Sequence, residues 1–220
     1  MRLVRCKSEL IEAAHDMRFL LSRGYTRKVS LRVVSNRYGL PRNDQMVLYR
    51  GVYDNETAEL HSRKMVTQEA IKAMELRVDW YNVFITVEGG IRGETLVMGD
   101  DGFLRDTRGL HGKHWETDAS LEALKKIFLF LKDLGVKIVN FYLDEMVSKS
   151  GEMRVFLEET MGRHGLHGEA VTTKTPDREV ICGEISASSD SIIIERASAV
   201  FDIPSNLFFE DENIVAAVLM

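Results

Sequence analysis

Cysteine and proline are scarce in this sequence. Its 220 residues include only 2 cysteines, Cys6 and Cys182, and these form no Cys-x-x-Cys pair. Their scarcity argues against a disulfide framework or a cysteine-rich zinc site and fits a reducing compartment. With only 3 prolines and 45% hydrophobic residues, the chain should bury a sizeable core and contain no long disordered tract.

Long apolar runs are absent as well. The most apolar stretch, residues 127–131, is far shorter than the roughly 20 residues that span a bilayer. No apolar run follows Met1–Arg5, so no signal peptide is expected. The sequence therefore predicts a soluble, cytoplasmic protein with no membrane partner.

Several enzyme signatures are missing. There is no Gly-x-x-x-x-Gly-Lys-Ser/Thr loop for nucleotide hydrolysis and no Gly-x-Ser-x-Gly nucleophile elbow. Asp79 lacks the second aspartate, two positions on, that a phosphoaspartate-type phosphatase carries. The pairs His111/His114 and His164/His167 have no cysteine or acidic partner at a useful spacing, which disfavours zinc.

Charge is distributed unevenly along the chain. Residues 1–65 contain 13 Lys and Arg against 7 Asp and Glu, whereas the remainder contains 16 against 27. Basic surface attracts phosphate backbones, while clustered carboxylates favour a cation. Two unrelated solvated surfaces would explain the difference equally well, so charge alone leaves both interpretations open.

The basic first part is predicted to be helical. The spacing of apolar residues, together with capping residues and glycines, predicts three helices. The first has Ser8 as its N-cap and ends at Gly24, the second covers 27–39 and the third covers 41–51. Helix, glycine-containing turn and helix is the helix-turn-helix pattern, but small packing modules share it. Residues 52–66 are polar and lack a periodic signal. We place a boundary there, between a basic all-α module (1–66) and a second domain (67–220).

The second domain alternates predicted strands with predicted helices. Strands are expected at 76–79, 95–98, 136–143, 170–171 and 184–186, and helices at 67–74, 81–87, 118–134, 151–161 and 191–199. This alternation predicts a parallel sheet in a layered α/β domain.

Three aspartates occupy equivalent places in this pattern. Asp79 and Asp144 end predicted strands, and Asp190 follows a third after two serines. The carboxyl ends of parallel strands meet at one edge of a sheet, and adjacent strands lie about 4.8 Å apart. Unneutralised carboxylates there would repel one another, and Mg²⁺ or Mn²⁺ would resolve the conflict. Singly, each aspartate could be an ordinary helix cap.

Other polar residues are secondary candidates. Asn82 lies one turn after Asp79 and could orient a carboxylate, and Trp80 and Tyr81 could stack on a base or belong to the core. The remaining candidates are loop residues that could bind a metal or phosphate or merely form turns and caps: Asp100, Asp101, Asp106, Asp177, Ser148, Lys149 and Ser150.

The motifs at 78–82 (Val-Asp-Trp-Tyr-Asn), 143–151 (Leu-Asp, then Ser-Lys-Ser-Gly) and 188–191 (Ser-Ser-Asp-Ser) resemble the PIN-like nuclease superfamily, particularly its NYN branch. That resemblance covers roughly residues 76–200. Over nearly its full length, the chain also resembles a prokaryotic family of unassigned activity that joins a short helical module to such a domain. The stretches 19–25 and 37–40 carry the similarity of the module.

The resemblance implies a PIN-like three-layer domain with an acidic metal site. It assigns Asp79, Asp144 and Asp190 to that site, with Asn82 and Ser189 nearby. PIN-like nucleases usually offer a fourth acid, for which Asp101, Asp106 and Asp177 are contenders.

These observations lead to one preferred function and two alternatives. The preferred function is a nuclease that uses Mg²⁺ or Mn²⁺ and acts on RNA ahead of DNA. Its substrate would contact residues of two kinds, those near the acidic edge and two arginines of the first module: Ser148, Lys149, Ser150, Ser189, Arg37 and Arg42. The first alternative is a non-catalytic nucleic-acid-binding or regulatory protein that uses the basic module. The second is an interaction scaffold whose module packs on the α/β domain or on another copy in a homo-oligomer.

Overall fold

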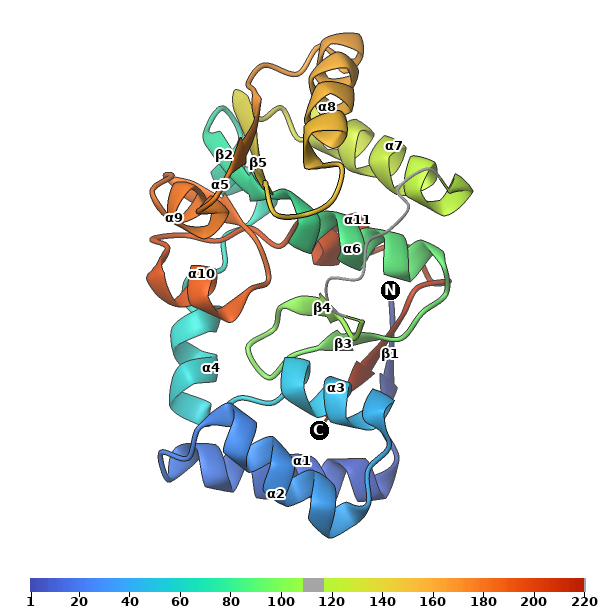
Figure 1. The fold of residues 1–220 in the computed structure, drawn as a ribbon, viewed down its shortest axis with the longest axis vertical. Coiled ribbons are helices and arrows are strands. Elements are labelled where there is room, and N and C mark those ends of the chain that lie inside the picture. Colours follow the sequence, from blue (N-terminus) through green and yellow to red (C-terminus); the bar gives the residue numbers. More distant parts are fainter. Residues whose placement is uncertain (109–116, 220) are drawn as a thin grey trace.

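A computed structural model describes residues 1–108 and 117–219 of the chain (Figure 1). The strands are β1 (Arg2–Arg5), β2 (Glu75–Asp79), β3 (Leu96–Met98), β4 (Leu104–Asp106), β5 (Ile138–Asp144), β6 (Ala170–Thr173), β7 (Ile185–Ala187) and β8 (Val215–Val218). The helices are α1 (Ser8–Ser22), α2 (Arg27–Tyr38), α3 (Arg42–Gly51), α4 (Asn55–Ser62), α5 (Gln68–Ile71), α6 (Trp80–Ile91), α7 (Asp118–Asp133), α8 (Ser150–His164), α9 (Pro176–Ile181), α10 (Ser191–Arg196) and α11 (Ile203–Leu207).

Four strands between Glu75 and Ala187 form a parallel sheet in the order β6-β5-β2-β7, called here the central sheet. Residues alternate between the faces of its strands. Leu76, Val78 and Phe141 point to the face that packs against α6, α7 and α8. Tyr142 points to the opposite face, where it packs against α9 and α10. Helices therefore cover both faces, and the predicted α/β class with a parallel sheet is confirmed.

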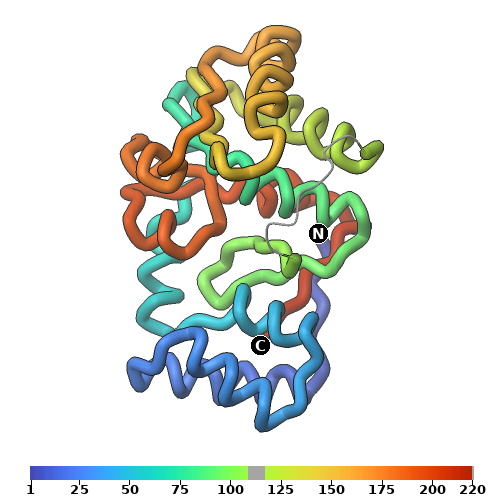
Figure 2. Tube along the Cα trace, in the orientation of Figure 1, coloured from blue at the N-terminus to red at the C-terminus, as the bar shows by residue number. Residues whose placement is uncertain are grey.

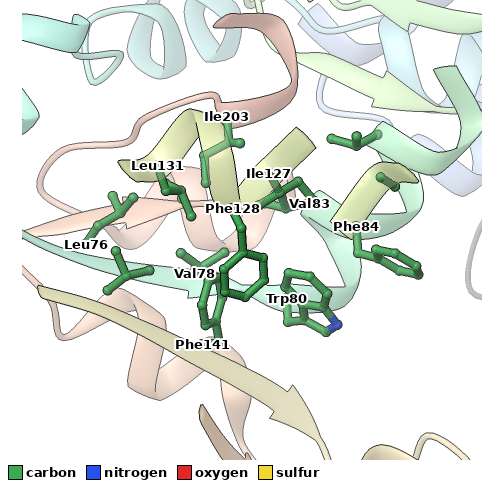
Figure 3. Packing of buried hydrophobic residues seen from close by; sticks show 14 of the residues in the cluster. Leu76, Val78, Trp80, Val83, Phe84, Ile127, Phe128, Leu131, Phe141 and Ile203 are labelled. Carbon is green, nitrogen blue, oxygen red and sulfur yellow. The ribbon is translucent and has the colours of Figure 1, made fainter. Parts of the chain in front are cut away.

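The larger core lies between the central sheet and α6, α7 and α8. Figure 3 shows the part of this core that β2, β5, α6 and α7 form. Trp80 is fully buried, and its ring stacks on Phe84 with 5.2 Å between the ring centroids. Its edge contacts Phe141, whose ring lies beside that of Phe128. Trp80 therefore belongs to the core and cannot stack on a nucleic-acid base.

A second sheet, in the order β1-β8-β3-β4, joins the two ends of the chain. Strand β1 pairs in parallel with β8, from Arg2 opposite Val215 to Arg5 opposite Val218. The blue first residues and the red last residues lie side by side in Figure 2. The prediction of an all-α module over 1–66 is therefore wrong at its start. All four residues of β1 are exposed, so no alternation of buried and exposed positions marks the strand in the sequence.

Residues 1–66, called here the front module, contribute β1 to this second sheet and pack their first three helices on it. Helices α1, α2 and α3 share a core with Val97 of β3 and with Leu219. Gly39 ends α2 in the left-handed conformation (φ 59°), as its position predicted. Ser8 is the first residue of α1 and not its N-cap, a position that Lys7 occupies.

Residues 52–66, the polar stretch without a periodic signal where we place the domain boundary, contain the helix α4. Asp54 caps it by accepting a hydrogen bond of 2.9 Å from the Thr57 N–H, and only His61 of the helix is buried. A helix with one buried residue leaves no periodic apolar pattern, which explains why the sequence did not indicate it.

Among the described residues, no helix combines the length and apolar character needed to cross a membrane.

Candidate functional site

An aspartate stands at or just beyond the carboxyl end of each strand of the central sheet. Asp79 and Asp144 are the last residues of β2 and β5. Asp177 lies in the first turn of α9, which follows β6, and Asp190 is the N-cap of α10, which follows β7. All four face one pocket of about 300 Å³, called here the acidic pocket. Its other lining residues are Arg50, Tyr81, Asn82, Ile85, Asp106 and Pro176.

The alternation of side chains along a strand places Asp79 and Asp144 on the same face of the sheet. Asp79 shares its face of β2 with Arg77, whose guanidinium donates a 3.0 Å hydrogen bond to the Glu179 carbonyl oxygen in α9. Asp144 shares its face of β5 with Tyr142, which packs against α9 and α10. Both carboxylates therefore point toward the helices that carry Asp177 and Asp190.

Asp79 is the aspartate whose ionisation is most perturbed. Burial raises its pKa from 3.8 to about 7; a hydrogen bond from Ser188 opposes the rise, and the charges of Asp190 and Asp177 add to it. The Ser188 hydroxyl donates to Asp79 Oδ2 over 2.9 Å and accepts a 3.0 Å hydrogen bond from the Asp190 N–H. At neutral pH the Asp79 carboxyl is therefore divided between its protonated and ionised forms.

The pKa values of two other side chains in the pocket, Asp177 and Tyr81, are raised as well. Desolvation and the charges of Asp190 and Asp144 raise the pKa of Asp177 above its ordinary value. Burial and the nearby Asp144 charge raise the pKa of Tyr81 to about 12, so its hydroxyl stays protonated and can donate a hydrogen bond. Uncompensated negative charge is thus the main electrostatic feature of the acidic pocket.

Asp144 and Asp190 each use one carboxylate oxygen for a local turn. Asp144 Oδ1 accepts a 2.8 Å hydrogen bond from the Met146 N–H, and Asp190 Oδ1 accepts one of 2.8 Å from the Ile192 N–H. In the part of the chain that the structure describes, the Oδ2 atoms of both residues have no hydrogen-bond partner. Each aspartate can therefore be a cap and still offer an oxygen to a ligand.

Asn82 is held in place by Ser189. Asn82 Oδ1 accepts a 2.8 Å hydrogen bond from the Ser189 N–H and one of 2.9 Å from its hydroxyl. The Ser189 carbonyl oxygen in turn accepts a 2.8 Å hydrogen bond from Nε of the buried Arg105. Asn82 and Ser189 thus contact each other directly, and Asn82 also lines the acidic pocket with the aspartates.

Arg50 brings the front module into the acidic pocket. It lies near the end of α3 and lines the pocket together with Asp79 and Asp144. Its Nε is buried and has no hydrogen-bond partner among the residues that are described. Asp106, which is 4% exposed, completes this side of the pocket and accepts a 2.7 Å hydrogen bond from the Arg108 N–H. Residues of both parts of the chain therefore form one site.

Comparisons with known proteins identify the family. Residues 68–206, more than half of the chain, match the family model described as Domain of unknown function (DUF5616). The chain belongs to this family. Residues 9–64 match a second model, Protein of unknown function (DUF434). "Uncharacterized protein MJ0935" of Methanocaldococcus jannaschii is 33% identical over 190 residues, which are 86% of this chain and 91% of that relative. No solved structure matches the chain.

All four aspartates and Asn82 lie in the DUF5616 range, whereas Arg50 lies in the DUF434 range. The acidic pocket therefore needs residues of both matched ranges. In the described residues, no group of three or more His, Cys, Asp or Glu side chains is arranged to hold a metal ion. The carboxylates line one pocket without surrounding a single point.

Asp101 lies outside the acidic pocket. It is fully buried, and Arg105 donates to both of its carboxylate oxygens over 2.7 Å. His61 Nδ1 lies 2.9 Å from Asp101 Oδ2. Although burial raises its pKa, the hydrogen bonds with Arg105 and His61 lower it to about 2. Asp101 thus anchors α4 of the front module, and we do not carry its predicted metal-binding role forward.

The predicted phosphate contacts after β5 are also outside the acidic pocket. Ser148 is exposed, and Lys149 forms an ion pair of 3.6 Å with Glu152. Ser150 is buried and donates to the Glu145 carbonyl oxygen at 3.4 Å. The structure brings none of the three to the pocket wall.

Arg37 and Arg42 of the front module do not line the pocket either. Arg37 lies 3.3 Å from Asp16 in an ion pair, and Arg42 is exposed at the start of α3. Of the candidate zinc pairs, His111 and His114 fall outside the described residues, and the His164 ring packs beside Phe128.

Proposed function

We propose that this chain is a metal-dependent phosphodiesterase that cleaves RNA in the acidic pocket, and that its second domain is a PIN-like nuclease domain. The convergence of an aspartate from each strand end of the central sheet on one pocket carries the proposal. Ligands of parallel sheets bind at this edge. Hard divalent cations prefer carboxylate oxygens, and phosphates are their usual second partner.

Two carboxylates at a time suffice for such a cation. Mg²⁺ keeps several of its waters and is commonly held by one or two carboxylates together with substrate phosphates. This mode fits a pocket in which no three acidic side chains of the described residues converge on one point. We assign to Mg²⁺ or Mn²⁺ the Oδ2 atoms of Asp144 and Asp190, which have no hydrogen-bond partner among the described residues, together with Asp79 between their strands. When bound, the metal would lower the pKa of a water and neutralise phosphate charge.

Asp79 is suited to a second role. A carboxyl with a pKa of about 7 can accept and release a proton at neutral pH, as a general base must. Ser188 orients its Oδ2, and the amide of Asn82 is fixed beside it through Ser189. We therefore assign to Asp79 either cation binding or the acceptance of the proton from the attacking water.

Arg50 is the group that we assign to the substrate phosphate. A guanidinium carries its charge at every physiological pH and binds phosphate through paired donors. Arg50 lines the same pocket as the carboxylates, so a phosphate in the pocket could contact both the guanidinium and a metal ion held by the aspartates. The front module would then supply substrate binding, which explains why a basic module is joined to an acidic domain.

Calorimetry with Mn²⁺ tests the metal site. The wild-type protein should bind Mn²⁺, Asp144→Asn should lose at least about tenfold in affinity, and Asp133→Asn should bind as the wild type does. Asp133 is a matched control because its carboxylate is exposed at the end of α7. Cleavage of a labelled RNA should require the metal and should disappear in Asp79→Asn. Absence of Mn²⁺ binding by the wild type, or unchanged cleavage by Asp79→Asn, would refute the assignment.

The non-catalytic alternative depends on the cations of the front module. Besides Arg37, Arg27 is engaged internally: it donates to the Tyr49 carbonyl oxygen over 2.6 Å, and its guanidinium lies over the Tyr53 ring. Fewer cations are therefore left for a phosphate backbone than the sequence suggested. If this alternative holds, nucleic-acid affinity will fall steeply with salt and will not respond to Mn²⁺.

A further inference from the structure

A second hollow adjoins the acidic pocket and is not needed for metal binding. It has a volume of about 510 Å³ and lies along α9 and α10. It shares Asp144, Pro176 and Asp177 with the acidic pocket, so the two hollows meet along a common wall. We call it the cationic groove, because its lining contains Lys174, Arg178 and Arg196.

We propose that the cationic groove binds the single-stranded RNA segment next to the phosphate that occupies the acidic pocket. The inference rests on the proposed function, since that function places a phosphate beside Asp144. When one phosphate of an RNA strand occupies the acidic pocket, the rest of the strand must leave the pocket along the protein surface. Carboxylates alone along that path would repel the strand's phosphates. The groove offers a path that starts at the same aspartates and leads past three cationic side chains.

These cations are available to a ligand to different degrees. Lys174 forms a 3.7 Å ion pair with Glu145, and its side chain is 80% exposed. Arg178 and Arg196 are both exposed and have no ion-pair or hydrogen-bond partner for their guanidinium groups among the described residues. They belong to α9 and α10, which pack together through Val180 and Ile193. Two unpaired guanidinium groups on adjoining helices are suited to successive phosphates.

The apolar part of the groove indicates how the bases are held. Ile181 is half-buried and Ile192 is 48% exposed, which leaves aliphatic surface beside the cations. Among the described residues, the lining contains no aromatic side chain, so a base would pack on aliphatic surface without ring stacking. Phosphate contacts carry no sequence information, and aliphatic packing accepts any base. We therefore expect weak sequence preference.

The position of the carboxylates inside a pocket favours binding of single-stranded RNA over a duplex. Asp79, Asp144 and Asp190 are half-buried at the wall of the acidic pocket, so a phosphate that reaches them must enter the pocket from the surface of the protein. A double helix is stiff, with a persistence length of about 50 nm for DNA, and bending it costs free energy. A flexible single strand turns into the pocket at a smaller cost.

The test is binding of a fluorescent oligouridylate of about 12 nucleotides, within the usual site size of single-strand binders, with EDTA present to prevent cleavage. The double variant Arg178→Ala/Arg196→Ala should bind more weakly than the wild type. The slope of log affinity against log salt should become shallower by about 1.4, since each single-strand phosphate contact contributes about 0.7. The control Lys125→Ala/Lys132→Ala removes the same charge from exposed positions on α7, away from the groove, and should keep the wild-type slope.

Cys182 provides an independent readout because it is exposed and lines the groove. Bound oligouridylate should slow its alkylation several-fold. Cys6 is the internal reference: it is half-buried in the front module, and burial raises the pKa of its thiol. Its alkylation rate should not respond to the oligonucleotide.

Equal slopes for the two double variants, together with an unprotected Cys182, would overturn the proposal. Tighter binding of a duplex than of the single strand would also overturn it. Loss of oligonucleotide binding in Arg178→Ala/Arg196→Ala, in a protein that neither binds Mn²⁺ nor cleaves RNA, would support the groove while refuting the nuclease.

Discussion

The Ser188 hydroxyl donates a 2.9 Å hydrogen bond to Oδ2 of Asp79, across 109 positions of sequence. This bond stabilises the ionised carboxyl and limits the rise that burial imposes on the Asp79 pKa. It therefore sets how readily the aspartate ionises at neutral pH.

Replacing Ser188 with alanine should raise the Asp79 pKa above about 7, because the ionised form loses its donor. A hydrogen bond to a charged group is worth roughly 1.5–3 kcal/mol, which corresponds to at least about one pH unit. The pH of half-maximal Mn²⁺ binding should rise accordingly in a calorimetric titration. Ser198→Ala, at an exposed serine, is the control, and equal midpoints for both variants would contradict the role of Ser188.

Stability should depend on pH in a direction fixed by Asp79. Its folded-state pKa is about 7 against an ordinary 3.8, so between these values the folded chain holds a proton that the unfolded chain has released. The free energy of unfolding should therefore decrease as pH rises from about 4 to about 7, by no more than about 4 kcal/mol from this residue. Urea unfolding in EDTA measures the slope.

Asp79→Asn should make the decrease in the free energy of unfolding between about pH 4 and pH 7 smaller without removing it. The buried Asp202, whose pKa burial raises to about 6, adds a contribution of the same sign. Mn²⁺ should stabilise the wild type more at pH 8 than at pH 5, because ionised Asp79 is its partner. An identical pH slope in Asp79→Asn and the wild type would show that Asp79 ionises normally.

Arg50→Ala should lower the rate of RNA cleavage by about 10²-fold, the usual effect of removing one donor from a developing anionic charge. Mn²⁺ affinity should stay the same or increase slightly, because a positive charge leaves the acidic pocket. Arg42→Ala is a matched control, since Arg42 lies on the same helix, is exposed and does not line the pocket. Equal rates for the two variants would remove Arg50 from the site.

Asp101→Asn should destabilise the fold and spare the metal site. It breaks a buried pair with Arg105, and leaving one partner of such a pair costs about 3–5 kcal/mol. Glu59→Gln, which breaks the exposed pair with Arg63, should cost less than about 1 kcal/mol. Urea denaturation compares the two. If the folded Asp101→Asn protein bound Mn²⁺ as poorly as Asp144→Asn, the predicted metal-binding role of Asp101 would have to be restored.

Local patterns were sufficient for the strand ends of the central sheet. The β-branched and aromatic run of β5 stops at Asp144, and β2 stops at Asp79, so the sequence placed both residues correctly at the ends of parallel strands. The cap of α10 by Asp190 was likewise a local property, since Oδ1 accepts from a backbone N–H two residues on. Such features depend on neighbours in the chain and leave a readable signal.

Contacts between residues far apart in the sequence left no such local pattern. Asp101 and Asp106 lie in the same short hairpin, yet one pairs with Arg105 in the core and the other lines the acidic pocket. Composition could not separate them, because the difference depends on the partners each side chain meets in the fold, His61 and Arg105 for Asp101 and the pocket residues for Asp106.

The sequence by itself determined the α/β class, the helices α6, α7, α8 and α10 around the central sheet, and the strand-end positions of three aspartates, but it did not indicate α9. Hydrophobic periodicity, β-propensity and caps all act over a few residues. Only the tertiary structure decided that Asp177 joins those aspartates, that Arg50 of the front module enters their pocket, and that β1 pairs with β8. These contacts join residues that are far apart in the chain. Burial and charge in the folded molecule select them, and a short stretch of sequence contains neither.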